Sequence, residues 1–227
     1  MTKIALISDI HSNLEAFEAV LKEIKKSKVK RIFCLGDIVG YGASLNQCID
    51  LIRKNKIKSV MGNHDYEAIN LQGIEWFNPI ARNAILWTNK QLTEANKKFL
   101  KNLPTYLEFE NMFLVHGSPR EHIYEYIFPD LDEFDLREFF AITKKDVIAV
   151  GHSHIQFVKE FDNKLIINPG SVGQPRDLNN KAAFCFFDTK SLKVDLRRVE
   201  YDINKAANKI LKAGLPKFLA DRLYLGK

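Results

Sequence analysis

The stretch Cys34-Leu35-Gly36-Asp37-Ile38-Val39-Gly40 decides the fold, because in it a lone carboxylate follows an apolar strand. Residues 31–35 predict a short buried strand, and Gly36 breaks the apolar run. Asp37 is then expected at the carboxyl end of that strand, the edge of an open α/β sheet where ligands bind. Because a carboxylate has two oxygens that can bind two cations, we predict that the other metal ligands gather around Asp37.

The segments on either side of this stretch repeat the same arrangement. An apolar run at 3–8 ends at Asp9-Ile10-His11, and a shorter one at 58–61 ends at Gly62-Asn63-His64-Asp65. Apolar residues at helical spacing lie between these strands, at 14–24 after an N-cap at Ser12 or Asn13, and at 45–52. The resulting βαβαβ order predicts parallel strands joined by right-handed crossovers.

The second half of the chain changes from helical to strand periodicity. Residues 66–103 follow a helical pattern, with Trp76, Phe77, Ile80, Ile85, Leu86 and Trp87 as the expected core. His116-Gly117 and Gly151-His152-Ser153-His154 each end an apolar strand. Further strands are predicted at 105–110, 112–115, 146–150, 157–161, 164–167, 182–187 and 192–199, and helices at 133–143, 204–211 and 215–225.

Length and composition predict a single domain over residues 1–227. The chain is 46% apolar, enough for one sizeable core, and no linker, repeat or low-complexity tract divides it. We expect neither a targeting peptide nor a membrane span, because no apolar run approaches about 20 residues. Cys34, Cys48 and Cys185 are too isolated for a disulfide framework, so a cytoplasmic location is expected, with Cys34 and Cys185 in the core.

The net charge of +6 comes from the C-terminal part of the chain. Residues 190–227 carry 10 Lys/Arg and 4 Asp/Glu, a surplus of 10 − 4 = +6. Such a segment could bind nucleic acid or a membrane surface. Its charges are scattered over an expected strand and helix without interleaved aromatic residues, so we predict a solvated face instead.

Each polar motif is weak when it is taken alone. Asp9-Ile10-His11 could be a helix cap with a surface histidine, and Gly62-Asn63-His64-Asp65 has an ordinary turn composition. However, five of the six histidines fall in these motifs, all except His122. A mixed His, Asp and Asn set suits Mn, Fe, Co, Ni or Zn better than Mg alone. The ligands exceed those of one four-coordinate ion, and two ions that share a carboxylate would use them all.

The ordered motifs resemble those of the calcineurin-like metallophosphoesterases. All five are intact and in the family order: Asp9-Ile10-His11, Gly36-Asp37-Ile38-Val39-Gly40, Gly62-Asn63-His64-Asp65, His116-Gly117 and Gly151-His152-Ser153-His154. The short chain and the segment 168–176 are similar to the small single-domain prokaryotic phosphodiesterase branch. The resemblance implies a four-layer α-β-β-α sandwich with two mixed sheets.

The resemblance also implies roles for individual residues. One metal site would consist of Asp9, His11, Asp37 and His154, and the other of Asp37, Asn63, His116 and His152, with Mn²⁺ as the first expectation. A hydroxide between the ions would attack phosphorus. His64 would be the acid that protonates the leaving group, and Asp65 would orient His64.

We therefore expect a metal-dependent phosphodiesterase or phosphatase that acts on a small phosphoester or nucleotide. The alternative is a catalytically silent binding scaffold on the same fold, which would be expected to have lost His64 or several ligands. A nucleic-acid-binding protein is a third possibility, but the expected motifs are absent, so nucleic acid is expected only as a substrate. The substrate, the native metal and the oligomeric state stay open.

Three residues outside the metal motifs are expected to contact the substrate: Tyr41, Arg120 and Arg176. Tyr41 lies between two glycines just after Asp37, Arg120 follows His116-Gly117, and Arg176 ends the loop that begins at Asn168. An arginine fork could hold a phosphate oxygen that the metals do not reach. The alternative is that each arginine pairs with a nearby acid, Arg120 with Glu121 or Glu125 and Arg176 with Asp177.

Overall fold

The computed structural model describes residues 3–27, 29 and 31–227, and its strands form two sheets. One sheet contains β1 (Lys3–Ile7), β2 (Ile32–Cys34), β3 (Lys58–Ser59), β9 (Ala182–Asp188) and β10 (Val194–Val199) in the order β10-β9-β1-β2-β3. The other contains β4 (Tyr106–Phe109), β5 (Met112–Val115), β6 (Val147–Ala149), β7 (Gln156–Phe161) and β8 (Lys164–Pro169) in the order β4-β5-β6-β8-β7.

Both sheets are mixed, as predicted. In the first sheet β1, β2 and β3 are parallel, and β9 and β10 run antiparallel at one edge. In the second, β5, β6 and β8 are parallel, while β4 and β7 are antiparallel edge strands. The segments that carry the polar motifs are the parallel ones, so the motifs follow carboxyl ends of neighbouring strands.

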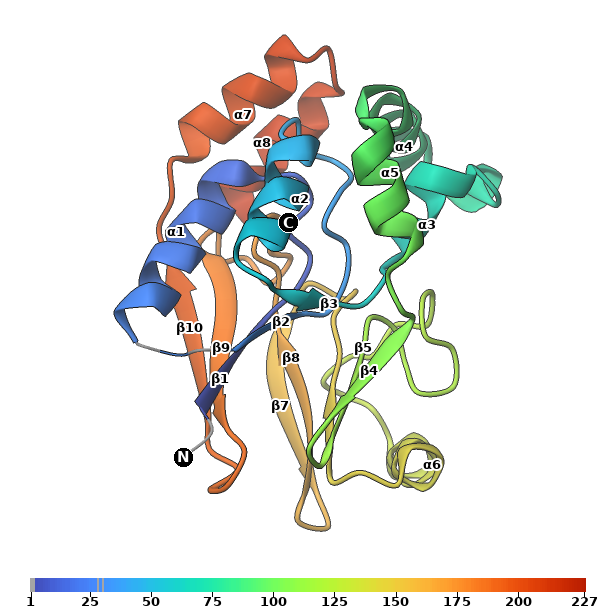
Figure 1. The fold of residues 1–227 in the computed structure, drawn as a ribbon, viewed down its shortest axis with the longest axis vertical. Helices are drawn as coiled ribbons and strands as arrows, with labels where there is room; N and C mark the ends of the chain where they lie inside the picture. Colours follow the sequence, from blue (N-terminus) through green and yellow to red (C-terminus); the bar gives the residue numbers. More distant parts are fainter. Residues whose placement is uncertain (1–2, 28, 30) are drawn as a thin grey trace.

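Within the described residues the helices cover the outer faces of the sheets (Figure 1). They are α1 (Leu14–Lys26), α2 (Leu45–Lys54), α3 (Asn63–Asn70), α4 (Pro79–Gln91), α5 (Glu94–Lys101), α6 (Glu133–Thr143), α7 (Ile203–Lys212), α8 (Lys217–Leu225) and the short 3-10 helix η1 (Ile74–Trp76). Asn13 caps α1 through its side chain, one of the two predicted caps.

Side-chain alternation along the strands builds the four layers. Ile4 and Leu6 of β1 pack between the two sheets, whereas Ala5 and Ile7 face the core beneath α1 and α2. On the other sheet the residues of β5 alternate between this inter-sheet core and the core beneath α6. Because successive side chains of a strand point to opposite faces, each strand contributes to two cores. The predicted α-β-β-α sandwich is confirmed.

The expected core over 66–103 is only partly the observed one: Ile85 is buried, Phe77, Ile80 and Trp87 are half-buried against core clusters, and Leu86 is half-buried outside them. Cys34 and Cys185 are buried strand residues with free thiols, as predicted. Trp76, expected in the core, is instead 87% exposed. The helical pattern over 66–103 is interrupted there, because η1 ends at Trp76 and a new helix begins at Pro79 with Asn78 as its N-cap. The prediction of a single domain over 1–227 stays a prediction.

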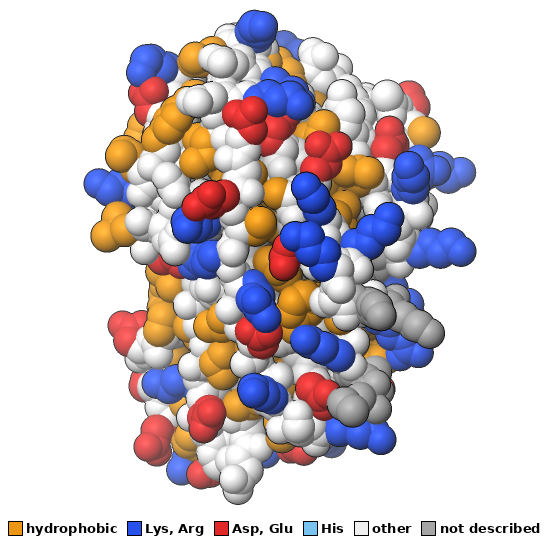
Figure 2. Space-filling model, turned by 90° about the vertical axis from the view of Figure 1, so that its left-hand side faces the viewer, with side chains coloured by type: hydrophobic (Ala, Val, Ile, Leu, Met, Phe, Trp, Pro, Cys, Tyr) orange, Lys and Arg blue, Asp and Glu red, His pale blue; other side chains and the backbone are white. Residues whose placement is uncertain are grey.

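The basic C-terminal part lies on a mixed surface. On the face drawn in Figure 2, Lys and Arg side chains alternate with acidic and apolar ones. Several of the C-terminal cations pair with carboxylates, among them Arg197 with Asp195 and Lys217 with Asp221. This pattern agrees with the predicted solvated face. In the described part of the chain, no helix has the length and apolar character needed to cross a membrane.

Candidate metal centre

The strand-end motifs meet at one place between the two sheets. All seven predicted ligands are buried there, with exposed fractions of 5% or less. They are Asp9, His11, Asp37, Asn63, His116, His152 and His154. Asp9 and His154 are 154 − 9 = 145 positions apart in the chain, and the packing of the two sheets brings them together.

One group of ligand atoms consists of Asp9, His11, Asp37 and His154, which all lie within 4.8 Å of one another. The Nε2 atoms of His11 and His154 are 3.0 Å apart. Asp9 Oδ1 is 3.4 Å from His154 Nε2 and 3.9 Å from His11 Nε2. Two carboxylates and two imidazoles in this arrangement form a ligand set for a transition-metal ion.

A second group contains Asp37, His116 and His152, whose ligand atoms also lie within 4.8 Å of one another. His116 Nε2 is 3.1 Å from His152 Nδ1 and 3.1 Å from the amide oxygen of Asn63. Asn63 thereby places a neutral amide oxygen beside this group. The membership of both groups is the one predicted from the sequence.

Asp37 belongs to both groups through a single oxygen. Its Oδ2 is 3.5 Å from His11 Nε2 and 3.5 Å from His116 Nε2. Its Oδ1 accepts a hydrogen bond from the His64 backbone N–H at 2.9 Å, which fixes the orientation of the carboxylate. One carboxylate oxygen therefore faces both histidine groups.

The hydrogen bonds of the four histidines fit cation binding. Each directs its other ring nitrogen at a backbone carbonyl: His11 at Val39 (3.1 Å), His116 at Leu35 (2.7 Å), His152 at Tyr124 (3.1 Å) and His154 at Gln174 (2.6 Å). A carbonyl only accepts, so the nitrogen facing it carries the proton and the other presents its lone pair. Pairs of lone pairs about 3 Å apart repel unless a cation lies between them, and carbonyl-bonded imidazoles are typical of metal ligands.

The backbone of these loops is held in an uncommon conformation. Five of the seven ligands have positive φ angles: Asp9 (54°), His11 (47°), Asp37 (54°), His152 (64°) and His154 (60°). Such angles in non-glycine residues cost roughly 1–3 kcal/mol each and persist where surrounding structure enforces them, often at functional sites. Backbone hydrogen bonds supply that enforcement, for example from Asp9 N–H to Gly36 and from His11 N–H to Asp37.

Two motif glycines allow the loops to approach closely. A Cβ at Gly62 would lie 2.1 Å from Asp37 Oδ1, and a Cβ at Gly36 would lie 2.8 Å from His116 Nδ1. Gly36 also has a φ of 91°. Any side chain at either position would therefore displace a ligand of the centre.

His64 lies beside the centre but outside both ligand groups. Its ring centroid is 4.3 Å from that of Tyr41 and 4.9 Å from that of His11, and its Nδ1 has no hydrogen-bond partner within the described structure. Burial, with the nearby charge of Arg176, holds the pKa of His64 well below 6.5.

Asp65 accepts backbone hydrogen bonds from two loops of the site. Its Oδ1 accepts from the Val39 N–H and its Oδ2 from the Gly62 N–H, both at 3.1 Å. Both oxygens are therefore engaged by the backbone of the loops that carry Asp37 and Asn63. Burial raises the pKa of Asp65 to about 6. Asp65 thus positions these two loops, and its predicted role of orienting the His64 ring stays a prediction.

Arg176 lies at the rim of the centre. Its Nη2 donates to Gln174 Oε1 at 3.0 Å and lies 3.5 Å from Tyr41 Oη, and its Nε has no partner in the described structure. The alternative of a pair with Asp177 is wrong, because Asp177 pairs with Arg198. The positive charge of Arg176 lowers the pKa of both Asp9 and Asp37, whose pKa values burial raises. Its guanidinium thus acts on the centre electrostatically.

Arg120 forms ion pairs with nearby carboxylates, which was the alternative to a contact with substrate. Its guanidinium pairs with Glu125, with Asp135 at 2.8 Å and with Glu138 at 2.6 Å, and it lies over the Phe139 ring. Three carboxylates and an aromatic face occupy the guanidinium, which favours the ion-pair alternative over a contact with substrate.

Sequence comparison identifies the family to which this geometry belongs. The profile of the calcineurin-like phosphoesterase superfamily domain matches residues 2–192. The chain belongs to this superfamily. Its resemblance to the small prokaryotic members is also confirmed by the relatives and structures that it matches.

Three of these matches cover 86% or more of the chain. Uncharacterized protein MJ0912 of Methanocaldococcus jannaschii is 48% identical, with 99% of this chain and 98% of the relative covered. The phosphodiesterase YfcE of Escherichia coli is 25% identical, with 86% of this chain and 91% of the relative covered. A metallophosphoesterase structure from Sphaerobacter thermophilus superimposes with a TM-score of 0.88 at 35% identity, covering 99% of this chain and 100% of that one.

A cleft lined by aromatic residues opens beside the centre, with a volume of about 790 Å³. We call it the aromatic cleft; its rings are those of Tyr41, Tyr66, Trp76, Phe77, Tyr124 and Tyr126. Asn63, His64 and His152 line it as well. Of the six rings only Tyr41 was among the predicted site residues. Tyr66 follows the motif that ends at Asp65, and the other four come from segments without metal motifs.

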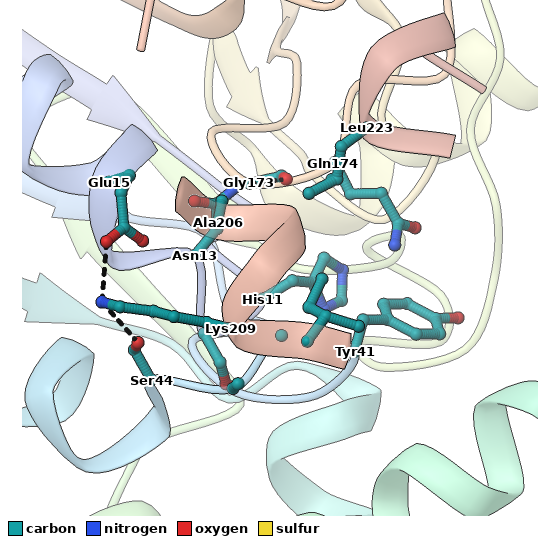
Figure 3. Close-up of a pocket in the computed structure, with 14 residues that line it drawn as sticks. His11, Asn13, Glu15, Tyr41, Ser44, Gly173, Gln174, Ala206, Lys209 and Leu223 are labelled. Carbon is teal, nitrogen blue, oxygen red and sulfur yellow. Dashed lines mark hydrogen bonds and ion pairs between the residues drawn. The ribbon is translucent and has the colours of Figure 1, made fainter. Parts of the chain in front are cut away.

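Residues of the C-terminal helices α7 and α8 line a pocket beside Tyr41 and His11 (Figure 3). The Lys209 side chain extends from α7 toward the start of α1. Its Nζ is 2.7 Å from Glu15 Oε1 and 3.3 Å from Ser44 Oγ. Tyr41, only 8% exposed, packs with alanines and leucines of α4, α7 and α8. These contacts tie the Asp37 loop to the C-terminal helices.

Substitution of Lys209 by Met should destabilise the fold by about 2 kcal/mol, because the Glu15 carboxylate, 4% exposed, loses its nearest cation. Urea unfolding measures this change. Lys212→Met on the exposed face of the same helix is the control and should stay within about 0.5 kcal/mol of the parent. The double variant Glu15→Gln/Lys209→Met should recover part of the loss. Equal stability of the Lys209 and Lys212 variants would contradict this role.

The affinity of the centre for metal ions should depend on pH. Burial raises the pKa of Asp9 to about 7, while the pKa values of His11, His152 and His154 are held well below 6.5, again by burial. The carboxyl must lose its proton to bind a cation, whereas these three imidazoles are already neutral. Asp37, whose pKa burial also raises, must lose its proton as well, so below pH 7 the apparent affinity for Mn²⁺ should fall by at least about tenfold per pH unit. Calorimetry at several pH values checks this, and an affinity that is constant from about pH 7 to pH 5 would contradict it.

Proposed function

We propose that the chain is a dinuclear metal-dependent phosphoesterase that hydrolyses phosphodiester bonds, with phosphomonoesters as a possible further class of substrate. The observation that carries the proposal is the position of Asp37 Oδ2, at 3.5 Å from a histidine of each ligand group. Membership of the superfamily supports a hydrolase, and the phosphodiesterase named among its relatives supports diesters.

Two divalent ions would be held by the two ligand groups described above. Asp9, His11, Asp37 and His154 would hold one ion, and Asp37, Asn63, His116 and His152 the other. Nitrogen and oxygen ligands of this mixture favour Mn²⁺, with Fe, Ni, Co or Zn as alternatives. When bound, a pair of such ions neutralises the charge of a phosphoester and makes a water nucleophilic near neutral pH.

The charge balance of the site supports an anionic substrate. The two metal ligands that carry negative charge are Asp9 and Asp37, since Asn63 is neutral and the histidines present lone pairs. The positive charge of two divalent cations would exceed the negative charge of these two carboxylates. Arg176 adds another positive charge at the rim. A phosphodiester anion would therefore be attracted to the site and could receive further hydrogen bonds from the guanidinium.

His64 is proposed to donate a proton to the leaving group. It lies between the ligand groups and the aromatic cleft, so a group that departs into the cleft would pass it. Its low pKa makes it neutral in the free protein, but the negative charge of a bound phosphoester favours the imidazolium form. A positioned imidazole of this kind typically contributes about 10²–10⁴-fold to the rate.

The substrate is proposed to be a small phosphoester or a nucleotide, in a cytoplasmic setting. A relative from Haemophilus ducreyi, named as a symmetrical bis(5'-nucleosyl)-tetraphosphatase, is 28% identical over 50% of this chain and 44% of its own length. Its name supports a nucleotide among the candidate substrates.

Hydrolysis of bis(p-nitrophenyl) phosphate tests the proposed activity. Protein freed of metal with a chelator should be inactive, and Mn²⁺, Ni²⁺ or Co²⁺ should restore turnover better than Mg²⁺. Metal content should be measured on the same samples. A protein that binds two ions but hydrolyses no diester or monoester would support the silent scaffold and contradict the phosphoesterase.

Substitution of Arg176 by Ala should raise KM for a diester by about tenfold with metal content unchanged, because a charge-assisted hydrogen bond to a phosphate oxygen is lost. Steady-state kinetics and metal analysis check both parts. Arg137→Ala removes an exposed arginine of α6 that pairs with Glu133, and it serves as the matched control. Parent values of KM and kcat in the Arg176 variant would show that this arginine does not hold the substrate.

A further inference from the structure

The aromatic cleft is continuous with the metal centre. His152, a proposed ligand, stacks on Tyr126 with ring centroids 3.7 Å apart and planes inclined by 21°. His64 meets the Phe77 ring edge-on at 5.5 Å. A phosphoester held at the centre would therefore extend one of its ester groups between these rings, so the cleft determines which ester group fits.

Trp76 presents its ring to solvent at the edge of the cleft. The turn at Gly73 (φ 82°) and the short helix η1 carry it, and the side chain is 87% exposed. A large exposed ring on a cleft wall is a surface on which a flat ligand can stack. Stacking on aromatic side chains is the usual way in which proteins bind unpaired bases.

The cleft also contains a buried acceptor. Glu67 lies one helical turn after Asn63, hence on the same face of α3, and is 1% exposed. Tyr124 Oη donates to its Oε1 at 2.6 Å, whereas Oε2 has no hydrogen-bond partner in the described structure. An unpaired buried carboxylate oxygen costs free energy that a ligand N–H could offset. A plain hydrocarbon group would leave it unpaired.

We propose that the aromatic cleft binds the base of a nucleotide, with the rings stacking on its faces and Glu67 accepting a hydrogen bond from an exocyclic amino group. This inference rests on the proposed phosphoesterase function, for which it names the substrate class. The volume of about 790 Å³ lies in the range of small-molecule pockets. The combination of flat apolar walls and one buried acceptor matches an amino-bearing base better than a lipid or a sugar.

Tryptophan fluorescence can report on this site. The chain has two tryptophans, and Trp87→Phe leaves Trp76 as the only one. The Mn²⁺-loaded variant should be titrated with AMP and with ribose 5-phosphate, which has the phosphate but no base. AMP should quench the fluorescence and bind about tenfold more tightly than ribose 5-phosphate. Equal affinities, or binding of AMP without a change in Trp76 fluorescence, would overturn the proposal.

Calorimetry on variants of the parent chain assigns the contributions of single residues. Trp76→Ala should weaken AMP binding by about tenfold and leave ribose 5-phosphate unchanged. Phe134→Ala removes another exposed ring, 75% exposed on α6, and should alter neither. A loss of affinity for both ligands in the Trp76 variant, or an equal loss for AMP in the Phe134 variant, would contradict stacking in the cleft.

The purine riboside 5'-phosphate, which lacks the amino group of AMP, tests Glu67. The parent protein should bind AMP several-fold more tightly than this analogue, and Glu67→Gln should shrink the difference. If the two ligands bind equally well to the parent, Glu67 does not read the amino group.

Failure of this inference can be told apart from failure of the proposed function. A protein that hydrolyses bis(p-nitrophenyl) phosphate but does not distinguish AMP from ribose 5-phosphate keeps the function and loses the base site. A protein that distinguishes them but never hydrolyses a phosphoester keeps the base site and loses the function.

Discussion

Asp37→Asn is expected to empty both metal sites together. Its Oδ2 is the one oxygen that faces a histidine of each ligand group, so the substitution removes a negative charge shared by two cations. Two ions in a buried site then repel each other without compensation. The amide could also place N–H donors where His11 and His116 present lone pairs. Purified variant protein should carry little metal and have lost at least about 10²-fold in turnover.

Metal analysis by mass spectrometry of the purified protein checks this expectation. Asp195→Asn is the control, because it makes the same chemical change at a surface carboxylate paired with Arg197. That variant should keep both ions. If the Asp37 variant held two ions as tightly as the parent, Asp37 would not be their shared ligand.

His64→Gln should separate metal binding from chemistry. His64 is buried beside the centre, and none of its ring nitrogens belongs to a ligand group, so the metal content should match that of the parent. Turnover should fall by about 10²–10⁴-fold, the usual contribution of a general acid. The expected pattern is an intact metal centre that has become catalytically poor.

The loss in the His64 variant should depend on the leaving group. A nitrophenolate leaves readily without a proton, whereas an alkoxide or a ribose hydroxyl needs one. The ratio of parent to variant rates should therefore be smaller for bis(p-nitrophenyl) phosphate than for an alkyl or nucleoside diester. Identical ratios for both substrates would rule out proton donation by His64.

The fold and the metal ligands could be predicted because both depend on local patterns. Ile4, Leu6 and their neighbours alternate with period two, which identifies a strand whatever surrounds it. The predicted ligands Asp9, Asp37 and His116 follow directly after such strands. Parallel pairing brings Asp9 beside Asp37, and packing of the two sheets brings His116 to them. The family motifs assigned the remaining ligands.

Other features depend on partners that lie far away in the sequence. The local alternative for Arg120 named Glu125 but not Asp135 and Glu138 of α6, which Arg120 also pairs with. The local alternative for Arg176 named Asp177, which instead pairs with Arg198 of β10. The Asp65 carboxylate accepts a hydrogen bond from the Val39 N–H. Motif spacing does not predict this contact.

Trp76 was misplaced for a different reason. Its position fits a helical pattern, but a helix boundary at Asn78 and Pro79 turns the ring outward. The signal was present in the sequence as an N-cap followed by proline.

An anomalous-scattering experiment on crystals loaded with Mn²⁺ tests the central claim most directly. The dinuclear proposal predicts two manganese peaks, both within coordination distance of Asp37 Oδ2, one among His11 and His154 and the other among His116 and His152. A single peak, or two peaks of which only one contacts Asp37, would contradict a metal centre bridged by this carboxylate.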